Sequence, residues 1–284
     1  MTTRLLFAVL SSCLAASASQ AQPIPWHELK DATELSAKER AVADKALHAI
    51  ECYAGCKGTI AKCLGVRPKV KTAWRLADYV VFLAGMTLDL EELTKAMQQR
   101  RESVLPAKVH RIALDDLPRL GDPKAKVVLV EYADFQCGHC ATLSPVLEKL
   151  VQRFKGALVV YFKPYPLANK GPRMVAAQAA LAAHRQGKFW PMAKLLFEDS
   201  DAHTPSGVEG LARKLKLDLD PFRAAMKDAA LLKQIERSKI EGVRIGLVGT
   251  PTLFFNGKRY HLPKDEKHLW DRVEEELELM GGKR

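Results

Sequence analysis

The chain has few cysteines, no internal repeat, no low-complexity tract and no long apolar run beyond its first residues. Its 48% hydrophobic and 27% charged content argues against collagen-like, disordered and coiled-coil chains. The longest later apolar stretch, Tyr79 to Ala84, falls far short of the roughly 20 residues that a membrane span needs. We therefore expect a globular protein, and 284 residues at roughly 150 per domain suggest two domains.

A concentrated patch of one charge is also missing. The formal net charge is +11, which by itself invites a nucleic-acid interpretation. However, basic residues alternate with acidic ones almost everywhere, as where Lys258-Arg259 is followed by Asp265-Glu266. No basic stripe or tail results, so we expect no nucleic-acid partner.

The first 21 residues have the pattern of a secretory signal peptide. Arg4 precedes an apolar run from Leu5 to Leu10, and small residues follow up to a small-x-Ala cleavage site at Ala21. We therefore expect residues 1–21 to be a signal peptide and the mature protein to be exported. An alternative is the bacterial lipoprotein box that ends at Cys13, which would leave this cysteine acylated at the mature terminus.

Cysteine usage limits the alternatives further. Cys13 would leave with the signal peptide, and the five remaining cysteines are too few for a disulfide-stapled scaffold. Their number is odd, so at least one thiol is free, shared or catalytic. These residues are Cys52, Cys56, Cys63, Cys137 and Cys140.

Residues 22–104 are predicted to form a small all-helical domain. Ser36 and Glu39 form a capping box that opens a helix, whose apolar side continues to Tyr53 and which Gly55 and Gly58 end. Two further helices are expected, one from Thr72 to Ala84 and one from Thr87 onward.

Residues 105–284 have an α/β pattern. β-type runs are expected at 109–114, 127–132 and 158–162, and an amphipathic helix at 141–154 separates the last two. A strand, a helix and a strand at this spacing form a βαβ unit with parallel strands. A helix-rich stretch at 171–246, a hairpin turn at Asn256-Gly257 and a terminal helix at 264–279 complete the chain.

Cys137-Gly138-His139-Cys140 lies between a predicted strand and a predicted helix, the setting of a redox C-x-x-C rather than of zinc. At the helix N-terminus, unpaired N–H groups and the helix dipole stabilise a Cys137 thiolate, and a protonated His139 would add to this. Cys137 is then the nucleophile. Cys140, one turn further along, can attack a mixed disulfide on Cys137 and release the partner.

Several motifs around this pair resemble a known family. They are Val130–Gln136, Pro145, Lys163–Leu167, Gln186–Trp190 with Leu196–Phe197, and Gly249–Gly257. Together they are similar to the thioredoxin fold and, more narrowly, to DsbA-like periplasmic thiol:disulfide oxidoreductases. The resemblance implies a thioredoxin fold with a helical insertion at about 170–245, preceded here by the small all-α domain.

The resemblance also implies roles for individual residues. Pro251 matches the cis-proline that faces the redox pair, and the neighbouring Gly249 and Thr250 match the segment that binds an extended substrate strand. Glu131 matches a buried carboxylate that moves a proton to or from the inner cysteine. Burial raises the pKa of such a carboxyl, which can then serve as a base near neutral pH. For Pro251 the alternative is an ordinary turn with a trans-proline, and for Glu131 it is a solvated residue on a strand.

Two departures leave the direction of the reaction open. DsbA-like oxidases usually have proline after the first cysteine, whereas Gly138-His139 is the pair of eukaryotic protein disulfide isomerases. Thr250 likewise resembles the isomerase-type members. We expect a periplasmic enzyme that acts on exported polypeptides, is recycled by a membrane or periplasmic redox partner and needs no dissociable cofactor and no metal. A homodimer through residues 22–104 is left open, since isomerases use two facing sites, although nothing in these residues demands it.

The N-terminal cysteines allow three interpretations. His48, Cys52 and Cys56 are spaced four residues apart, which would place them on one helix face, and Cys63 follows. They could form an auxiliary redox relay, a metal site of three thiolates and an imidazole, or one structural disulfide beside a buried free cysteine. A competing function is therefore a periplasmic metal- or client-binding protein whose thioredoxin domain only maintains its thiols.

Overall fold

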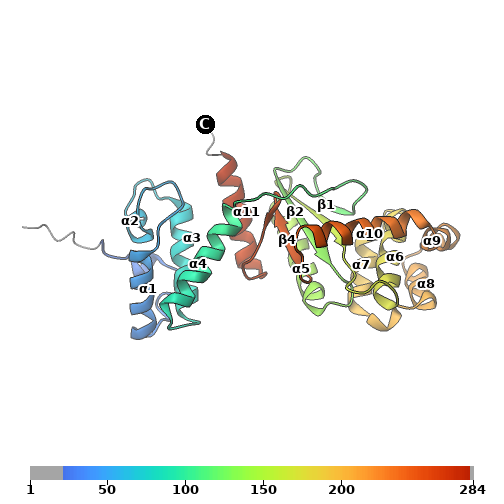
Figure 1. Ribbon diagram of the computed structural model, residues 1–284, viewed down its shortest axis with the longest axis horizontal. Helices are drawn as coiled ribbons and strands as arrows, with labels where there is room; N and C mark the ends of the chain where they lie inside the picture. The colour runs from blue at the N-terminus through green and yellow to red at the C-terminus, as the bar shows by residue number, and fades with distance from the viewer. Residues whose placement is uncertain (1–21, 282–284) are drawn as a thin grey trace, which may run out of the picture. The chain divides into compact units, whose positions relative to one another are not determined.

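The computed structural model describes residues 22–281, and the chain divides into two compact units, Met1–Thr94 and Lys95–Arg284 (Figure 1). The predicted signal peptide and Cys13 lie outside the described residues. The boundary falls earlier than the expected 104/105. The reason is that the end of helix α4 (Leu90–Val104) belongs to the second unit, where the Ser103 hydroxyl accepts a hydrogen bond from the backbone N–H of His261 at 3.0 Å.

Short helices make up the described part of the N-terminal unit, as predicted. The capping box is confirmed: the Ser36 hydroxyl accepts the N–H of Glu39, and the Glu39 carboxylate accepts the N–H of Ser36 at 2.6 Å. Gly65 and Gly85 each follow the last residue of a helix. In chain order the elements are η1 (Trp26–Glu28), α1 (Ala37–Ala49), α2 (Ile60–Leu64), α3 (Lys71–Ala84) and the start of α4.

The prediction that the first helix extends to Tyr53 was wrong. Helix α1 ends at Ala49, because the backbone of Ile50 to Cys52 pairs with residues 58–60 instead of continuing the helix. The N–H of Cys52 donates to the carbonyl of Gly58 at 2.9 Å, and the N–H of Ile60 donates to the carbonyl of Ile50 at 2.9 Å. Of His48, Cys52 and Cys56, only His48 therefore lies on α1. The prediction that these three residues share one helix face was wrong.

The C-terminal unit is built around a five-stranded sheet in the order β1-β3-β2-β4-β5. The predicted βαβ unit is confirmed, since β2 and β3 are parallel and α5 (Gly138–Arg153) connects them, while the other pairs are antiparallel. The strands are β1 (Arg119–Gly121), β2 (Val127–Ala133), β3 (Leu158–Pro164), β4 (Thr252–Phe255) and β5 (Lys258–Arg259).

The β-type run at 109–114 is not a strand, contrary to expectation. Two of its backbone N–H groups bond to a turn and a side chain instead of a neighbouring strand. That of His110 donates to the carbonyl of Gly257 at 2.8 Å, and that of Ala113 donates to the Glu241 carboxylate at 3.0 Å. The segment has β-type side chains, but it joins none of the ladders that the described residues form.

Helices pack on the sheet, which explains why β2 and β3 are apolar on both faces. Helix α5 contacts β3 and α11, whereas α10 contacts β3 and α6. The helical insertion predicted at about 170–245 is present. Among residues 22–281, no helix combines the length and the apolar character needed to cross a bilayer. The elements are α6 (Pro172–His184), α7 (Phe189–Glu198), η2 (Ser200–Ala202), α8 (Pro205–Lys214), α9 (Leu219–Met226), α10 (Ala229–Arg244) and α11 (Glu266–Gly281).

A buried cluster of charges joins α11 to the end of α4. Arg272 is fully buried, forms ion pairs with Glu275 and Glu276, and donates to the carbonyl of Ser103 at 2.9 Å. Arg100, 2% exposed, lies 3.5 Å from Glu275. Each buried charge thus has an opposite partner, without which its desolvation would be costly.

The predicted hairpin at Asn256-Gly257 is confirmed and positions strand β4, which directly follows the segment predicted to bind substrate. Both residues have positive φ, 50° and 78°, as a two-residue hairpin turn requires. The Asn256 side chain also accepts the N–H of Val128 at 2.8 Å, which fastens the turn to the central strand.

Gly257→Ala should destabilise the protein by about 2 kcal/mol or more. A Cβ atom there would collide with the backbone carbonyl of His110, in addition to the strain of a left-handed residue. Gly156→Ala is the matched control, because Gly156 has a φ of +79° but open space around its Cβ position. Urea unfolding should show the larger loss for Gly257→Ala, and equal losses would contradict the collision.

Candidate active site

The C-x-x-C pair begins helix α5 directly after the central strand, as predicted. Cys137 is the N-cap residue with an extended backbone, and its carbonyl accepts the N–H groups of Cys140 at 3.0 Å and Ala141 at 3.1 Å. Both cysteines of the pair are free thiols in this structure. They differ in access, because Cys137 is partly exposed and Cys140 is fully buried. Only Cys137 can meet a substrate without a structural change.

The surroundings of Cys137 favour its thiolate. Burial raises the pKa of this thiol, but its interactions with Thr250, Cys140 and His139 outweigh burial and lower the pKa overall. In the thiol form, Cys137 Sγ lies 3.2 Å from the carbonyl oxygen of Thr250 and donates to it. The exposed His139 lies beside the pair on the same helical turn.

Glu131 on β2 and Cys140, the inner member of the pair, are both buried titratable groups. Side chains alternate along β2, so Glu131 points to the same face as Ala133, which shares a core cluster with Cys140. Burial, followed by the negative charge of Cys137, raises the pKa of Glu131 to about 8, and one of its carboxyl oxygens has no hydrogen-bond partner. Burial, followed by the charge of Glu131, also raises the pKa of the Cys140 thiol.

The segment predicted to bind substrate lies opposite Cys137. The peptide bond between Thr250 and Pro251 is cis, as the resemblance implied. The register of β4 on β2 pairs Thr252 with Tyr132, which brings Pro251 to the end of the strand from which the Cys137 loop leaves. The carbonyl of Gly249 accepts the Thr252 hydroxyl at 2.7 Å and holds the turn before the proline.

A pocket of about 420 Å³ lies beside the redox pair. The sequence analysis missed most of the residues that line this pocket, although the hairpin register indicates one of them. The backbone N–H of Tyr260 donates to the carbonyl of Leu253 at 2.9 Å, and the same register, continued by two residues, places Leu262 opposite Pro251. Burial lowers the pKa of Lys264 at the pocket wall. The lining residues are His139, Thr142, Leu143, Thr250, Pro251, Leu262, Pro263 and Lys264.

Asp134 positions the loop that carries Cys137, a role that sequence reasoning also missed. Its carboxylate is buried and accepts the N–H groups of Gln136 and Leu167, each at 2.8 Å. It also forms an ion pair with Arg173, and its backbone carbonyl accepts the N–H of Cys137 at 3.0 Å. The negative charge is thus compensated, and these contacts hold the loop that carries Cys137.

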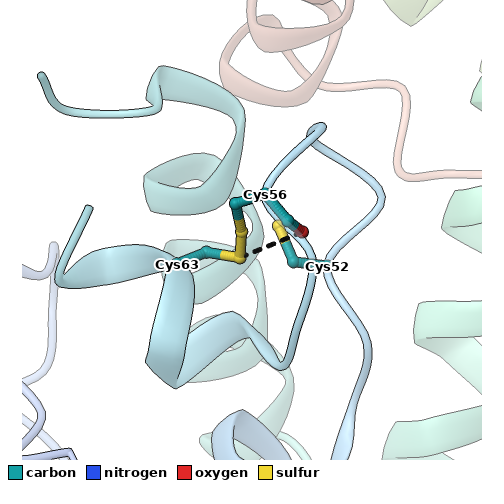
Figure 2. A group of neighbouring side chains, drawn as sticks. All are labelled: Cys52, Cys56 and Cys63. Atoms are coloured by element: carbon teal, nitrogen blue, oxygen red, sulfur yellow. Dashed lines mark hydrogen bonds between the residues drawn. A yellow bond between two sulfur atoms is a disulfide. The ribbon is translucent and has the colours of Figure 1, made fainter. Parts of the chain in front are cut away.

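The N-terminal cysteines converge in the other unit (Figure 2). Cys56 and Cys63 form a disulfide with a Cα–Cα distance of 5.8 Å, and Cys52 is a buried free thiol. One disulfide beside a buried free cysteine is one of the three predicted interpretations. The imidazole of the predicted metal site is not with them, because the ring nitrogens of His48 lie 2.9 Å from the Asp44 carbonyl and 3.0 Å from the Gln22 carbonyl.

Comparisons with known sequences place the second unit in a family. The family model described as thioredoxin matches residues 115–275, and the chain belongs to this family. The Na(+)/H(+) antiporter NhaA 3 of Salinispora tropica is 36% identical over 144 residues, which are 50% of this chain and 22% of that protein. The NhaA of Herminiimonas arsenicoxydans is 34% identical over 139 residues, 49% and 22% of the two chains. The chain thus spans about a fifth of the length of these curated relatives.

Several solved structures share the fold of the second unit. A thioredoxin-like oxidoreductase from Silicibacter pomeroyi matches with a TM-score of 0.53 and 24% identity over 63% of this chain and 98% of that chain. BdbD from Bacillus subtilis matches with a TM-score of 0.53 and 22% identity, over 60% and 97%. The thiol-disulfide exchange protein alpha-DsbA2 from Wolbachia pipientis matches with a TM-score of 0.52 and 20% identity, over 65% and 96%. The predicted α/β fold class with a thioredoxin fold is confirmed.

Proposed function

We propose that this protein is an enzyme that catalyses thiol–disulfide exchange on polypeptides through Cys137 and Cys140. The observation that carries the proposal is the contrast within the pair. Cys137 is accessible, begins a helix and has a lowered pKa, whereas Cys140 is buried and has a raised pKa. One sulfur is thus suited to meet the substrate and the other to complete the exchange.

In the oxidising direction, a substrate thiolate attacks Cys137 Sγ of the Cys137–Cys140 disulfide. A new S–S bond forms to the substrate, the bond to Cys140 breaks, and Cys140 takes up a proton. A second substrate thiolate then attacks the substrate sulfur of the mixed disulfide and releases Cys137 as a thiolate. The substrate loses two electrons and the pair gains them.

Glu131 is the proton carrier in this scheme. Its pKa of about 8 leaves the carboxyl largely protonated at neutral pH, so it can protonate the Cys140 thiolate as that group leaves. In the reverse direction the carboxylate takes the proton back. A solvated glutamate, with the ordinary pKa of 4.5, would be ionised and could not donate.

Substrates are extended segments of exported polypeptides in this proposal. The pocket beside Cys137 has apolar walls at Leu262 and Pro263, and Val248, just before the cis-proline segment, is 95% exposed. An extended chain can bond to the backbone of Thr250 while its apolar side chains cover these residues. A periplasmic location and a redox partner that recycles the pair belong to the same proposal, and the signal-type pattern of residues 1–21 supports the location.

The reduction potential of the Cys137–Cys140 pair tests the direction of the reaction. The lowered pKa of Cys137 stabilises the reduced pair, so we expect an oxidising potential between about −180 and −120 mV. The measurement is equilibration of the full chain with glutathione buffers, with the oxidised fraction read by thiol alkylation and mass spectrometry of the peptide that contains the pair.

A value near about −270 mV would contradict an oxidase and indicate a reductase. Absence of any exchange between glutathione and the pair would overturn the enzymatic proposal altogether. The peptide-level readout keeps Cys52, Cys56 and Cys63 from contributing to the result.

A further inference from the structure

Three sulfurs meet at one point of the N-terminal unit, which contains no part of the C-x-x-C pair. The Sγ atoms of Cys52, Cys56 and Cys63 all lie within 4.8 Å of one another (Figure 2). Cys63 is fully buried, Cys52 is 8% exposed and Cys56 is partly exposed. Three sulfurs therefore face a common centre that is largely shielded from water.

The backbone holds this arrangement independently of the disulfide. An antiparallel bridge between Glu51 and Thr59, together with the two backbone hydrogen bonds between 50–52 and 58–60, closes the loop that carries Cys52 and Cys56. Thr59 then caps helix α2, on which Cys63 lies one turn further along. The carbonyls of Cys56 and Gly58 lie 3.6 Å and 3.9 Å from Cys63 Sγ. The loop thus remains closed when the S–S bond opens.

The Cys56–Cys63 disulfide does not explain why a third cysteine, Cys52, lies buried beside it. A bond between Cys56 and Cys63 closes the loop without a third thiol, and an alanine or valine would fill the space of Cys52 without a reactive group. The thiolate of a cysteine is the form that binds a metal.

We propose that, when the Cys56–Cys63 disulfide is reduced, Cys52, Cys56 and Cys63 form a three-thiolate site for one soft monovalent cation, Cu(I). Sulfurs bound at about 2.3 Å to one ion lie about 4 Å apart. The three sulfurs lie within 4.8 Å of one another, and the two that are bonded in the disulfide move apart when that bond opens. Opening the disulfide requires only side-chain rotation at Cys56 and Cys63, whose Cα atoms are 5.8 Å apart.

The donor set selects the ion. Thiolates favour Cu(I) and Zn(II) among the common metals. Structural zinc almost always takes four ligands, whereas Cu(I) is satisfied by three sulfurs. Among the described residues, no fourth histidine, cysteine or carboxylate joins the cluster. The nearest candidate by sequence, His48, is already engaged by two backbone carbonyls.

The site is controlled by redox state. A dithiol reductant supplies two electrons and two protons, its own sulfurs form a disulfide, and Cys56 and Cys63 become thiols. Binding of Cu(I) then displaces up to three protons from the three thiols, so affinity rises with pH. In the reverse step a disulfide-bonded partner accepts two electrons from the Cys56 and Cys63 thiolates and becomes a dithiol, the Cys56–Cys63 bond forms again, and the ion loses two of its three ligands. In the oxidised form only Cys52 keeps a free thiol in this cluster.

The test uses the full chain carrying Cys137→Ser and Cys140→Ser, so that the C-x-x-C pair cannot bind copper. The phosphine-reduced protein is titrated anaerobically with Cu(I) in competition with bicinchoninate. We expect one Cu(I) per chain, three Cu–S distances by X-ray absorption, and a loss of affinity of at least about 100-fold on adding Cys52→Ser. Air-oxidised protein with the Cys56–Cys63 bond intact should bind at least about 100-fold more weakly than the reduced form.

Cys52→Ser is a suitable variant because Cys52 takes no part in the disulfide. The thermal unfolding midpoint of the oxidised variant shows whether it folds. If Cys52→Ser folds and binds Cu(I) as before, or if the oxidised protein binds equally well, the three-thiolate site is wrong. Tighter binding of Zn(II) than of Cu(I) would overturn the choice of ion. Because the test protein lacks the C-x-x-C sulfurs, failure of the proposed exchange activity would leave these outcomes unaffected.

Discussion

Cys137→Ser should abolish thiol–disulfide exchange, with a loss on the order of 10³-fold or more, because it removes the only accessible sulfur of the pair. Cys140→Ser should have a different result. The chain then keeps the nucleophile but lacks the sulfur that resolves the intermediate, so mixed disulfides on Cys137 accumulate. Mass spectrometry after mixing with a peptide disulfide distinguishes the two variants.

The two variants are controls for each other, because each removes one sulfur from the same helical turn. If Cys137→Ser formed the stable mixed disulfide and Cys140→Ser did not, the roles would be reversed and the burial of Cys140 would be misinterpreted. Unchanged circular dichroism of both proteins shows that the fold is intact. Equal residual activity in both would place the exchange on other cysteines.

Local patterns of sequence predicted most of the second unit. The βαβ unit around 127–164 and the hairpin at Asn256-Gly257 depend on short-range preferences, namely apolar runs, a helix N-terminus and residues that tolerate positive φ. The C-x-x-C motif was placed correctly for the same reason, since it lies at one strand-to-helix junction. In both cases the residues that carry the signal are close in the chain to the residues with which they form structure.

Predictions of secondary structure failed where residues distant in the sequence, or beyond a turn, bind the backbone groups of a segment. The run at 109–114 has strand-forming residues, but the N–H of Ala113 is taken by the Glu241 carboxylate, far away in the sequence. Likewise α1 ends at Ala49 because Ile50 to Cys52 find backbone partners at 58–60. Periodicity describes what a segment can form alone, and it does not reveal which partner competes for its backbone groups.

Part of the site was invisible for a related reason. Asp134 and Lys264 are charged residues that sequence alone would place on the surface, yet Asp134 is buried under the Cys137 loop and Lys264 lies in the pocket wall. Arg272 and Glu276 on α11 were expected in an ordinary terminal helix and form a buried ion pair instead. Such residues are found only when the partner that compensates their charge is known.

Glu131→Gln should change how stability depends on pH. In the folded protein the Glu131 pKa is about 8, against an ordinary value of 4.5, so between these pH values the folded state holds a proton that the unfolded state has released. Stability must therefore fall as the pH rises from about 4.5 to about 8, and the loss is complete above that range. One unit of pKa shift corresponds to roughly 1.4 kcal/mol, so the shift of about 3.5 units in the Glu131 pKa corresponds to a loss of about 4 to 5 kcal/mol in the free energy of unfolding.

A neutral amide of the same shape does not ionise, so Glu131→Gln should be more stable than the natural protein by a few kcal/mol at about pH 9 and nearly equal to it at about pH 4.5. Urea unfolding of the reduced proteins at about pH 4.5, 7 and 9 measures the difference. Glu236→Gln is the matched control, because Glu236 is exposed on α10 and its loss should leave the pH dependence unchanged.

A further variant separates the two causes of the Glu131 shift. Burial is the larger cause and remains in Cys137→Ser, whereas the charge of the Cys137 thiolate is removed. The pH dependence should therefore persist in Cys137→Ser but end at a lower pH. Glu131→Gln should also slow the protonation of Cys140 at neutral pH, so that exchange becomes slower while the protein becomes more stable. A variant that lost both stability and activity would show that Glu131 supports the fold and not the proton transfer.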